Sequence, residues 1–585
     1  MAATVGSDSQ PGATFDEMVD HVIVGSGAGA VIAALVAVDA GQSVVILEKQ
    51  ERFGGSTGYS GGVLWIPNNP VMAREGIEDS YERSRVYLDA AVRYDGPGTT
   101  PTRRKAFLTS GPEMVRYLES KGMRFERTAG YADYFDELPG GEPRSRSLAA
   151  PLFNIRALGE WRQRLSVYPL RPLRISAGEL SKLVLVKTNR SARVLAAKVA
   201  MRMVRDALRR RDVRGAGGAL QGRLLALALE ASVPIRLQTP VVDFVCDGDT
   251  VTGVVVSEGG RPRRIGARHA VLLNAGGYSH NARLRQVHGP SPNATPWTLA
   301  NPGDTGELLE AAVGLGAATD AMDEHWWSLT SLGPGETFPH GTLTKDGQRV
   351  PFSHHFDITL PHVILVDQDG RRFVNESTNY MEHGQRLYAR HRETGRGIPA
   401  WAIIESRHRR RYLWGSVMGR TPRQWLRSGY MKQANTLEDL ARQCEIDPVG
   451  LRQTVERFNG FCLTGVDEEY GRGARAFDRY HGDPAVRPNP NLGMIERPPF
   501  YAVAIYPTDI GSAGGLVTDA DGRVLDESGA AIEGLYATGN STASVMGRSY
   551  PGAGASIAAS CVFAYRAALH ATRRPASDGL LAAAT

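Results

Sequence analysis

The chain has 585 residues, which is long enough for two or three packed domains. Hydrophobic residues make up 42% and charged residues 22%, an ordinary globular composition that excludes a mainly disordered chain. The formal net charge is +6, which says little unless the charge is concentrated in one segment. Four widely spaced cysteines without a CxxC pair exclude a disulfide scaffold and a thiolate zinc site, and we predict no metal site: Cys246, Cys444, Cys462 and Cys561.

The ends and the hydropathy of the chain bear on its location. No apolar run reaches the roughly 18 residues that a transmembrane helix needs. The first fifteen residues lack the basic and then apolar pattern of a signal peptide. We therefore expect a cytoplasmic protein, either soluble or attached peripherally to the membrane.

The first structured segment is predicted to be a strand, a turn, a helix and a second strand. The run His21–Val24 is fully apolar, and a glycine-rich turn and an alanine-rich helix follow it up to Gly41. The next apolar run, Ser43–Leu47, ends at Glu48. This spacing is typical of a parallel βαβ unit.

The turn of this unit has the pattern G-x-G-x-x-A at Gly25, Gly27 and Ala30, with Glu48 eighteen positions after the alanine. Gly25 permits the tight turn, Gly27 lets the backbone approach a pyrophosphate, and Ala30 allows close packing of helix on strand. The helix N-terminus favours phosphate, and Glu48 can accept hydrogen bonds from ribose hydroxyls. We predict a dinucleotide site; the alternative is a turn of small residues that serves packing alone. A second GxG at Gly314 follows a helical run, so we expect a helix end there.

Later segments bear on which dinucleotide the turn would bind, although the late strand and turn at 534–540 are equally explained as ordinary structure. A helix is predicted over 217–231 and alternating strands over 233–272, as a β-meander or a sheet extension. A mixed section runs to about 497, and strand-like runs and an apolar helix over 556–570 then follow. A chain whose last hundred residues return to the nucleotide domain is typical of large flavoproteins, whereas a nicotinamide enzyme usually completes that domain contiguously.

Six sequence pieces in order carry a family resemblance: GSGAGA, ILEK, FGGSTGYSGGVLWIPNN, NESTNY, GLYATGN and GRSYPGAG. Together they resemble the flavoproteins of the 3-ketosteroid dehydrogenase group, within the fumarate reductase flavoprotein superfamily. The resemblance implies an α/β fold with a Rossmann-type FAD-binding domain formed by both ends of the chain and an inserted α+β catalytic domain. The implied divisions are residues 16–307 and 498–575 for the FAD domain and 308–497 for the catalytic domain, with a basic insertion at about 150–215.

The resemblance also implies FAD bound without a covalent link, since GSTGYSGG has no histidine where covalent relatives carry one. The implied FAD-binding residues are Gly25, Ser26, Gly27, Ala28, Gly29, Ala30, Glu48, Lys49, Gly55, Ser56, Thr57, Ser60, Gly61, Ala275, Gly276, Asp304, Gly539, Asn540, Ser556 and Ile557.

The implied reaction is Δ1-dehydrogenation of a 3-ketosteroid in steroid degradation. Removing two hydrogens beside a ketone needs a base, donors to the ketone oxygen and a hydride acceptor. The resemblance implies that Tyr380 takes the C2 proton with help from Tyr134, that Tyr550 and the Gly554 N–H hold the ketone oxygen, and that flavin N5 takes the C1 hydride. Tyr131 lies three residues before Tyr134 and could be confused with it.

Residues 181–215 hold eleven Lys or Arg and two acids, so this segment carries +9 and the rest of the chain −3. At helical spacing, one arc is cationic: Lys198, Arg202, Arg205 and Arg209. A second arc is apolar: Ala197, Ala200, Met201, Val204, Ala207 and Leu208. This pattern predicts a helix that lies on an anionic membrane. The alternative is a surface helix whose apolar face packs on its own domain. No nucleic-acid motif accompanies the charge, and we expect no nucleic-acid partner.

Two other functions stay open at this stage. One is the same chemistry at another bond or on another substrate: a 3-oxo-5α-steroid 4-dehydrogenase, or a related ketone or fumarate-type oxidoreductase. The other is a membrane-bound flavoprotein that binds or transfers electrons without steroid turnover. The sequence does not name the electron acceptor, for which a quinone is one candidate.

Overall fold

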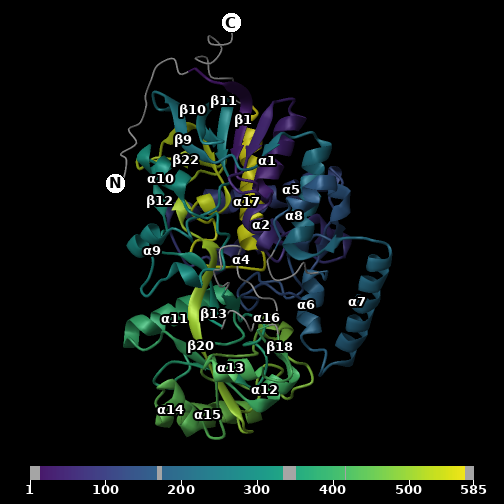
Figure 1. The fold of residues 1–585 in the computed structure, drawn as a ribbon, viewed down its shortest axis with the longest axis vertical. Helices are drawn as coiled ribbons and strands as arrows, with labels where there is room; N and C mark the ends of the chain where they lie inside the picture. Colours follow the sequence, from purple (N-terminus) through teal and green to yellow (C-terminus); the bar gives the residue numbers. More distant parts are fainter. Residues whose placement is uncertain (1–13, 168–173, 334–350, 416, 574–585) are drawn as a thin grey trace.

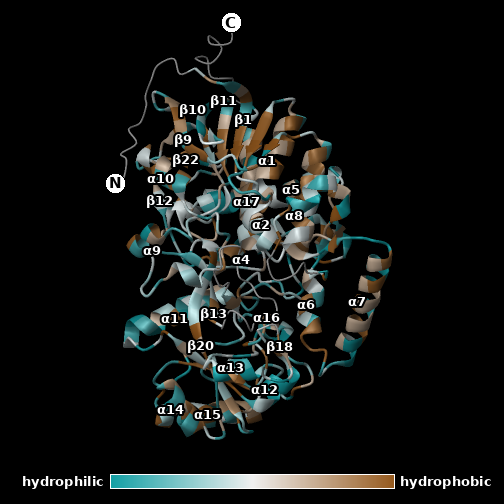
Figure 2. Cartoon of the chain, in the orientation of Figure 1, coloured by the Kyte–Doolittle hydropathy of each residue, from teal (hydrophilic) through white to brown (hydrophobic). Residues whose placement is uncertain are grey.

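The computed structural model describes residues 14–167, 174–333, 351–415 and 417–573. Two large sheets lie towards opposite ends of the long axis of the molecule (Figure 1). The first sheet and the helices that cover it form its most hydrophobic part (Figure 2). No helix among the described residues combines the length and the apolarity that crossing a membrane requires.

The first sheet has eight strands, and its centre is parallel. Its strand order includes β23, β11, β1, β2 and β8, each paired in parallel with the next: Ala531–Ala537, Arg261–Leu273, Glu17–Val24, Val44–Leu47 and Ile235–Arg236. The late strand β23 pairs directly with β11, Leu272 lying beside Tyr536. Strands covered on both faces read as continuous apolar runs, which explains β2 and the last three residues of β1. The α/β fold class with a sheet built from both ends of the chain is confirmed.

The predicted strands over 233–272 divide between two kinds of pairing. Strands β9 (Val241–Asp247) and β10 (Thr250–Glu258) extend β11 as an antiparallel meander. Strand β8 is not part of this meander. It pairs in parallel with β2, and Ile235 lies beside Ile46. The parallel edge and the antiparallel extension thus lie on opposite sides of β1.

Three helices support the predicted dinucleotide turn. Helix α1 (Ala28–Asp39) packs against α17 (Ala555–Ala571) and α8 (Ala216–Glu230). Every residue of α1 from Ala28 to Ala37 is buried, because its small side chains let neighbouring elements approach closely. The second GxG lies at the end of α10 (Glu307–Gly314), as predicted, and not at the start of a helix.

The second sheet has six antiparallel strands around the long β20 (Phe500–Ser512). Its partners include β13 (His325–Ser331), β16 (Ala400–Ile404) and β19 (Met431–Ala434). Strand β20 therefore belongs to this sheet although it lies beyond residue 498, where the catalytic domain was predicted to end. We propose that the chain returns to the FAD domain after β20, at about residue 513.

Candidate active site

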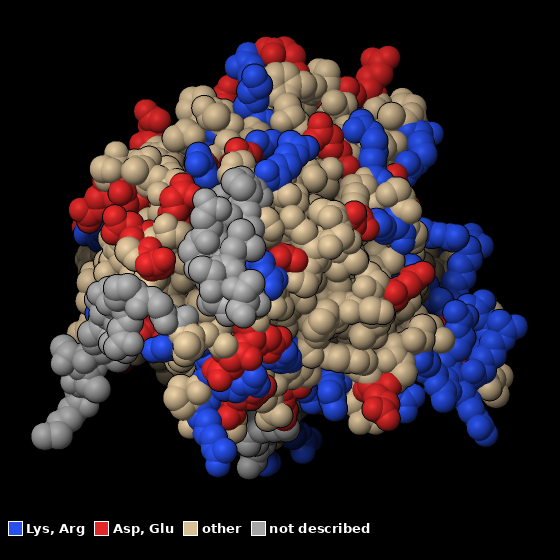
Figure 3. Space-filling model, turned by 90° about the horizontal axis from the view of Figure 1, so that it is seen from above, with Lys and Arg blue, Asp and Glu red and all other residues tan. Residues whose placement is uncertain are grey.

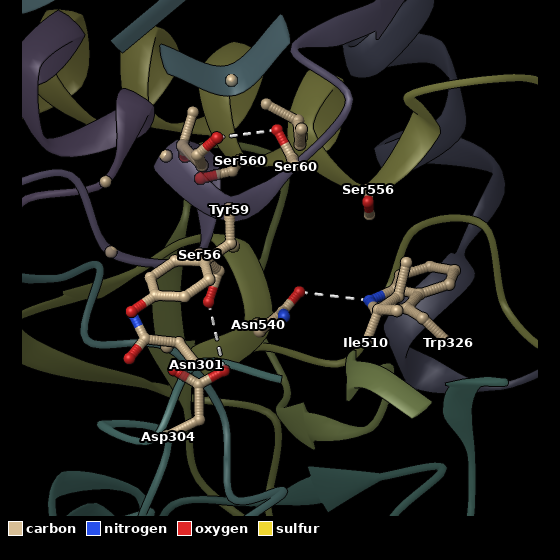
Figure 4. A pocket seen from close by; sticks show the side chains of 18 of the residues that line it. Ser56, Tyr59, Ser60, Asn301, Asp304, Trp326, Ile510, Asn540, Ser556 and Ser560 are labelled. Atoms are coloured by element: carbon tan, nitrogen blue, oxygen red, sulfur yellow. Dashed lines mark hydrogen bonds between the residues drawn. The ribbon is translucent and has the colours of Figure 1, made fainter. Parts of the chain in front are cut away.

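A cavity of about 650 Å³ is lined by residues of both sheets. Its walls include Val24, Leu47 and Leu273, the last residues of β1, β2 and β11, and Trp326 of β13 in the second sheet. Ligands of open parallel sheets bind beyond the carboxyl ends of the strands, which is where these residues lie. Part of this wall is drawn in Figure 4.

The dinucleotide turn has the close backbone geometry that its glycines predict. Gly25 has φ +96, and a Cβ there would lie 2.1 Å from the carbonyl oxygen of Asn274. A Cβ on Gly27 would lie 2.6 Å from Oδ1 of Asn274. No side chain larger than hydrogen fits at either position without a shift, and the open backbone faces the cavity. The turn therefore fits a dinucleotide pyrophosphate.

Glu48 lies at the end of β2 and lines the same cavity. Its Oε2 accepts a hydrogen bond from Ser26 Oγ at 2.5 Å, and its Oε1 accepts one from the Gln50 N–H at 2.9 Å. Burial raises the pKa of this carboxyl above its ordinary value. These bonds hold the carboxyl in place beside the turn, as a ribose-binding acid requires.

Most of the residues expected to bind FAD line the cavity, and three lie behind it. Ala28, Gly29 and Ala30 form the first turn of α1 and are buried. Ser56 Oγ donates to Asp304 Oδ2 at 3.2 Å (Figure 4). The lining residues are Gly25, Ser26, Gly27, Glu48, Lys49, Gly55, Ser56, Thr57, Ser60, Gly61, Ala275, Gly276, Asp304, Gly539, Asn540, Ser556 and Ile557. Their individual contacts with FAD stay predictions.

Asn274 is a site residue that the motifs missed. Its Nδ2 donates to Thr538 Oγ1 at 2.8 Å and to Ser560 Oγ at 2.9 Å, and its Oδ1 accepts from the Ala30 N–H at 3.3 Å. It thereby joins the first turn of α1, the residue after β23 and α17. An asparagine directly after a buried strand was the available signal, because the carboxyl ends of parallel strands meet at the ligand.

The three predicted tyrosines meet in the wall of the same cavity. Tyr380 begins α11 (Tyr380–Thr394), and Tyr550 precedes the turn into α17. The ring centres are 5.1 Å apart for Tyr380 and Tyr550, 5.5 Å for Tyr134 and Tyr550 and 5.9 Å for Tyr134 and Tyr380. Gly554 has φ +90, and a Cβ there would lie 2.1 Å from the carbonyl oxygen of Val63. All four residues line the cavity.

The structure also separates Tyr134 from its neighbour Tyr131. The ring of Tyr131 stacks on Tyr480 at 5.0 Å, and its hydroxyl lies 3.5 Å from that of Tyr134. Tyr134, by contrast, is in ring contact with both Tyr380 and Tyr550. The geometry therefore favours Tyr134 for the role that the sequence left open between the two.

Burial controls the protonation of the cluster. It raises the pKa values of Tyr134 and Tyr380 well above the ordinary phenol value of about 10. For Tyr380, the charge of Tyr550 acts in the same direction, whereas a hydrogen bond with Tyr134 lowers its pKa. Tyr380 is thus a neutral phenol in the substrate-free site at neutral pH and becomes a base only when ionised.

Two buried histidines adjoin the tyrosines and were not predicted. The ring centre of His355 lies 5.1 Å from that of Tyr380 and 5.3 Å from that of His481. Burial lowers the pKa of His355 well below its ordinary value and that of His481 to about 4, so both are neutral at pH 7. Neither lies in a recognisable motif, and only the packing of α11 and its neighbours brings them to the cavity.

The dinucleotide turn and the tyrosine cluster line one cavity. This combination defines an FAD-binding oxidoreductase. In agreement, residues 20–557 match the family described as the FAD binding domain. The chain is 39% identical to 3-oxosteroid 1-dehydrogenase of Mycobacterium tuberculosis (strain H37Rv), over 94% of this chain and 98% of that protein. It is 33% identical to 4-oxocyclohex-2-ene-1-carboxylate 5-dehydrogenase of Sinomonas cyclohexanicum, over 94% of this chain and 92% of that protein.

A solved structure agrees with these relatives. The crystal structure of 3-ketosteroid delta1-dehydrogenase from Sterolibacterium denitrificans in complex with 1,4-androstadiene-3,17-dione has a TM-score of 0.88 and 36% identity, over 95% of this chain and 99% of that one. The chain therefore belongs to the 3-ketosteroid dehydrogenase family of FAD-dependent oxidoreductases. This confirms the resemblance seen in the motifs, the enzyme class and FAD as the cofactor.

Proposed function

We propose that this chain is a 3-oxosteroid 1-dehydrogenase, which introduces the C1–C2 double bond into 3-ketosteroids during steroid degradation. The observation that carries the proposal is the meeting of Tyr134, Tyr380, Tyr550 and Gly554 in the wall of a cavity that the dinucleotide turn also lines. Apolar residues on further walls suit a steroid skeleton: Val63, Val167, Ile175, Leu180, Leu299 and Phe356.

Each residue has a role that the chemistry requires. The Tyr550 O–H and the Gly554 N–H donate to the ketone oxygen as negative charge develops on it. Tyr380, once ionised, takes the C2 proton, and Tyr134 donates a hydrogen bond to its oxygen. Bound FAD would supply the two-electron acceptor for the C1 hydrogen, and loss of the C1 and C2 hydrogens would leave the C1–C2 double bond. Ser556 Oγ lies 3.1 Å from the Tyr550 hydroxyl and orients it.

The direct test is anaerobic mixing of the purified holoenzyme with a 3-keto-4-ene steroid. We expect the oxidised-flavin absorbance band to bleach and mass spectrometry to detect a 1,4-diene. A flavin that stays oxidised would overturn the steroid assignment while leaving the family and the cofactor intact. That outcome would favour a flavoprotein that binds or transfers electrons without steroid turnover.

A second candidate is dehydrogenation of a smaller cyclic ketone, favoured by the 33% identity to the Sinomonas cyclohexanicum enzyme. The same donors and base would serve, because the reaction also removes hydrogens beside a ketone. Comparison of kcat/KM for a 3-ketosteroid and for 4-oxocyclohex-2-ene-1-carboxylate separates the two candidates. Product analysis separates both from a 4-dehydrogenase, which would form the C4–C5 double bond.

Membrane attachment through α7 (Arg190–Leu208) is a further part of the proposal. This helix lies at the edge of the molecule beside α6 (Ala177–Leu183), and Lys and Arg gather at that edge (Figures 1 and 3). Its apolar arc is uncovered: Met201 is 64%, Val204 60% and Leu208 80% exposed. A helix packed on its own domain would hide this face.

Two residues of the expected cationic arc have a carboxylate partner: Arg202, and Arg205, whose Nη2 lies 3.7 Å from Asp206 Oδ1. Arg202 turns towards α6, where its Nη1 lies 2.7 Å from Glu179 Oε1. Lys198, Arg205 and Arg209 remain exposed on α7 and next to it. The free charge is therefore smaller than the sequence predicts, and the apolar arc carries more of the proposed contact. A quinone dissolved in the same membrane would be a suitable electron acceptor.

Replacement of Met201 by aspartate should reduce co-sedimentation with anionic phospholipid vesicles severalfold, because it places a charge in the apolar arc. Val287→Asp is the matched control, since Val287 is equally exposed at 64% but lies on α9 (Ala282–His288). The control should bind vesicles as the unaltered protein does. Equal binding by all three proteins would contradict attachment through α7.

A further inference from the structure

Arg103 is a buried cation without a carboxylate partner in the described part of the chain. It lies in α5 (Pro101–Ser120), is 2% exposed, and its Nη1 donates to the carbonyl oxygens of Gly98 and Ala543. Its guanidinium carbon lies 4.8 Å from the ring centre of Phe563 in α17. Burial lowers its pKa to about 10, so it stays charged at pH 7. An unpaired buried charge is costly and therefore calls for a function.

A second, small cavity connects this charge with the candidate active site. It measures about 10 Å³, and Arg103 and Phe563 are among the residues that line it. Its lining also includes Trp326, Asn540 and Ser556, which line the large cavity as well. The wall between Arg103 and the active site is therefore formed by residues that face both spaces.

This shared wall belongs to the end of the large cavity where the chemistry occurs. Ser556 Oγ lies 3.1 Å from the Tyr550 hydroxyl, and the ring centre of Trp326 lies 5.0 Å from that of Tyr550. Trp326 Nε1 also donates to Asn540 Oδ1 at 3.1 Å (Figure 4). The hydride acceptor must lie beside the tyrosines, so the charge of Arg103 acts on that end of the FAD pocket.

Arg103 has donor capacity left over. Its Nε finds no hydrogen-bond partner among the described residues, although it is buried. The small cavity is about the size that one water molecule requires. A water there would accept a hydrogen bond from Nε. Its own O–H groups would point towards Asn540 and Ser556, which line the same cavity.

Hydride transfer from C1 delivers two electrons and one proton, while the C2 proton goes to Tyr380. The transfer therefore places one negative charge in the FAD pocket. We infer that Arg103 is an electrostatic positioning residue whose buried charge, which no described carboxylate pairs directly, stabilises that negative charge through the shared wall. The inference rests on FAD binding and not on the identity of the substrate.

The test is the midpoint potential of the bound flavin, titrated in the holoenzyme against a reference dye without steroid. Arg103→Gln should lower the equilibrium constant for two-electron reduction at least tenfold, or about 30 mV. Arg103→Lys should recover most of this loss, because it keeps the charge. Arg566→Gln is the matched control: Arg566 also bridges α17 to α5, at Ser110, but is paired with Asp521. The Arg566→Gln variant should change the equilibrium constant for two-electron reduction less than threefold.

Two outcomes would overturn the inference. One is that Arg103→Gln and Arg566→Gln shift the midpoint potential of the flavin equally. The other is that Arg103→Lys fails to restore the potential. Either result would leave Arg103 a purely structural residue. If Arg103→Gln does not fold, Asp320→Asn serves instead. Asp320 Oδ2 accepts from the Gly98 N–H at 2.9 Å, and with Asp519 its charge opposes that of Arg103. Its removal should raise the potential, and an unchanged or lower value would also overturn the inference.

Discussion

Tyr550→Phe should lower kcat by about 10²–10³-fold while FAD stays bound, because removal of one oxyanion donor typically costs that much. The variant keeps the ring, and with it the contacts with Tyr134, Tyr380 and Trp326. It loses only the O–H that donates to the ketone oxygen. Steady-state kinetics with a 3-keto-4-ene steroid measure the loss, and the flavin spectrum reports the cofactor.

Tyr565→Phe is a suitable control for this experiment. Tyr565 lies on α17, like the residues that follow Tyr550, but its ring packs against Tyr117 at 5.4 Å, away from the cavity. The same hydroxyl deletion there should leave kcat within twofold. Near-normal turnover of Tyr550→Phe would remove Tyr550 from the catalytic residues and weaken the steroid proposal.

Tyr380→Phe should slow flavin reduction in a single anaerobic turnover by about 10²–10⁴-fold, because a general base contributes that much. A second measurement shows whether Tyr380 acts as the base or only packs in the site. Exchange of the C2 hydrogen with deuterated solvent requires the base and should be lost in the variant. Exchange at the normal rate would show that another group takes the proton.

The pH dependence of the unaltered enzyme tests the same residue. Burial raises the pKa of Tyr380, so the ionised fraction is small at pH 7 and grows with pH. Well below the pKa this fraction increases about tenfold per pH unit. The rate of flavin reduction should therefore rise between pH 7 and 9 and should be flat in Tyr380→Phe. A flat profile of the unaltered enzyme would contradict an ionised Tyr380 as the base.

The motifs predicted those parts of the site that depend on local backbone. Gly25 and Gly27 must be glycine because the turn brings them against Asn274, so their pattern is visible in the sequence. The same holds for Gly554 at the start of α17. Asn274 itself escaped notice because its partners Thr538 and Ser560 lie more than 260 residues away.

The amphipathic helix α7 also shows that the sequence does not reveal contacts with distant segments. Its periodicity predicted an apolar arc and a cationic arc, and both exist. The sequence could not say that Glu179 of α6 would remove Arg202 from the cationic arc. Nor could it say which arc would be left uncovered, because that depends on where the remainder of the chain packs.

By itself, the sequence determined the parallel βαβ unit, the dinucleotide turn and, through its resemblance to a family, the cofactor, and it predicted the active-site tyrosines. These follow from local periodicity, from backbone conformations that only glycine adopts, and from short motifs. Only the tertiary structure decided that the ring of Tyr134 packs against Tyr380, that β20 joins the second sheet, and that Arg103 lies beside the active-site wall without a carboxylate partner among the described residues. The physical reason is that burial and charge compensation depend on contacts between segments hundreds of residues apart, which no local pattern records.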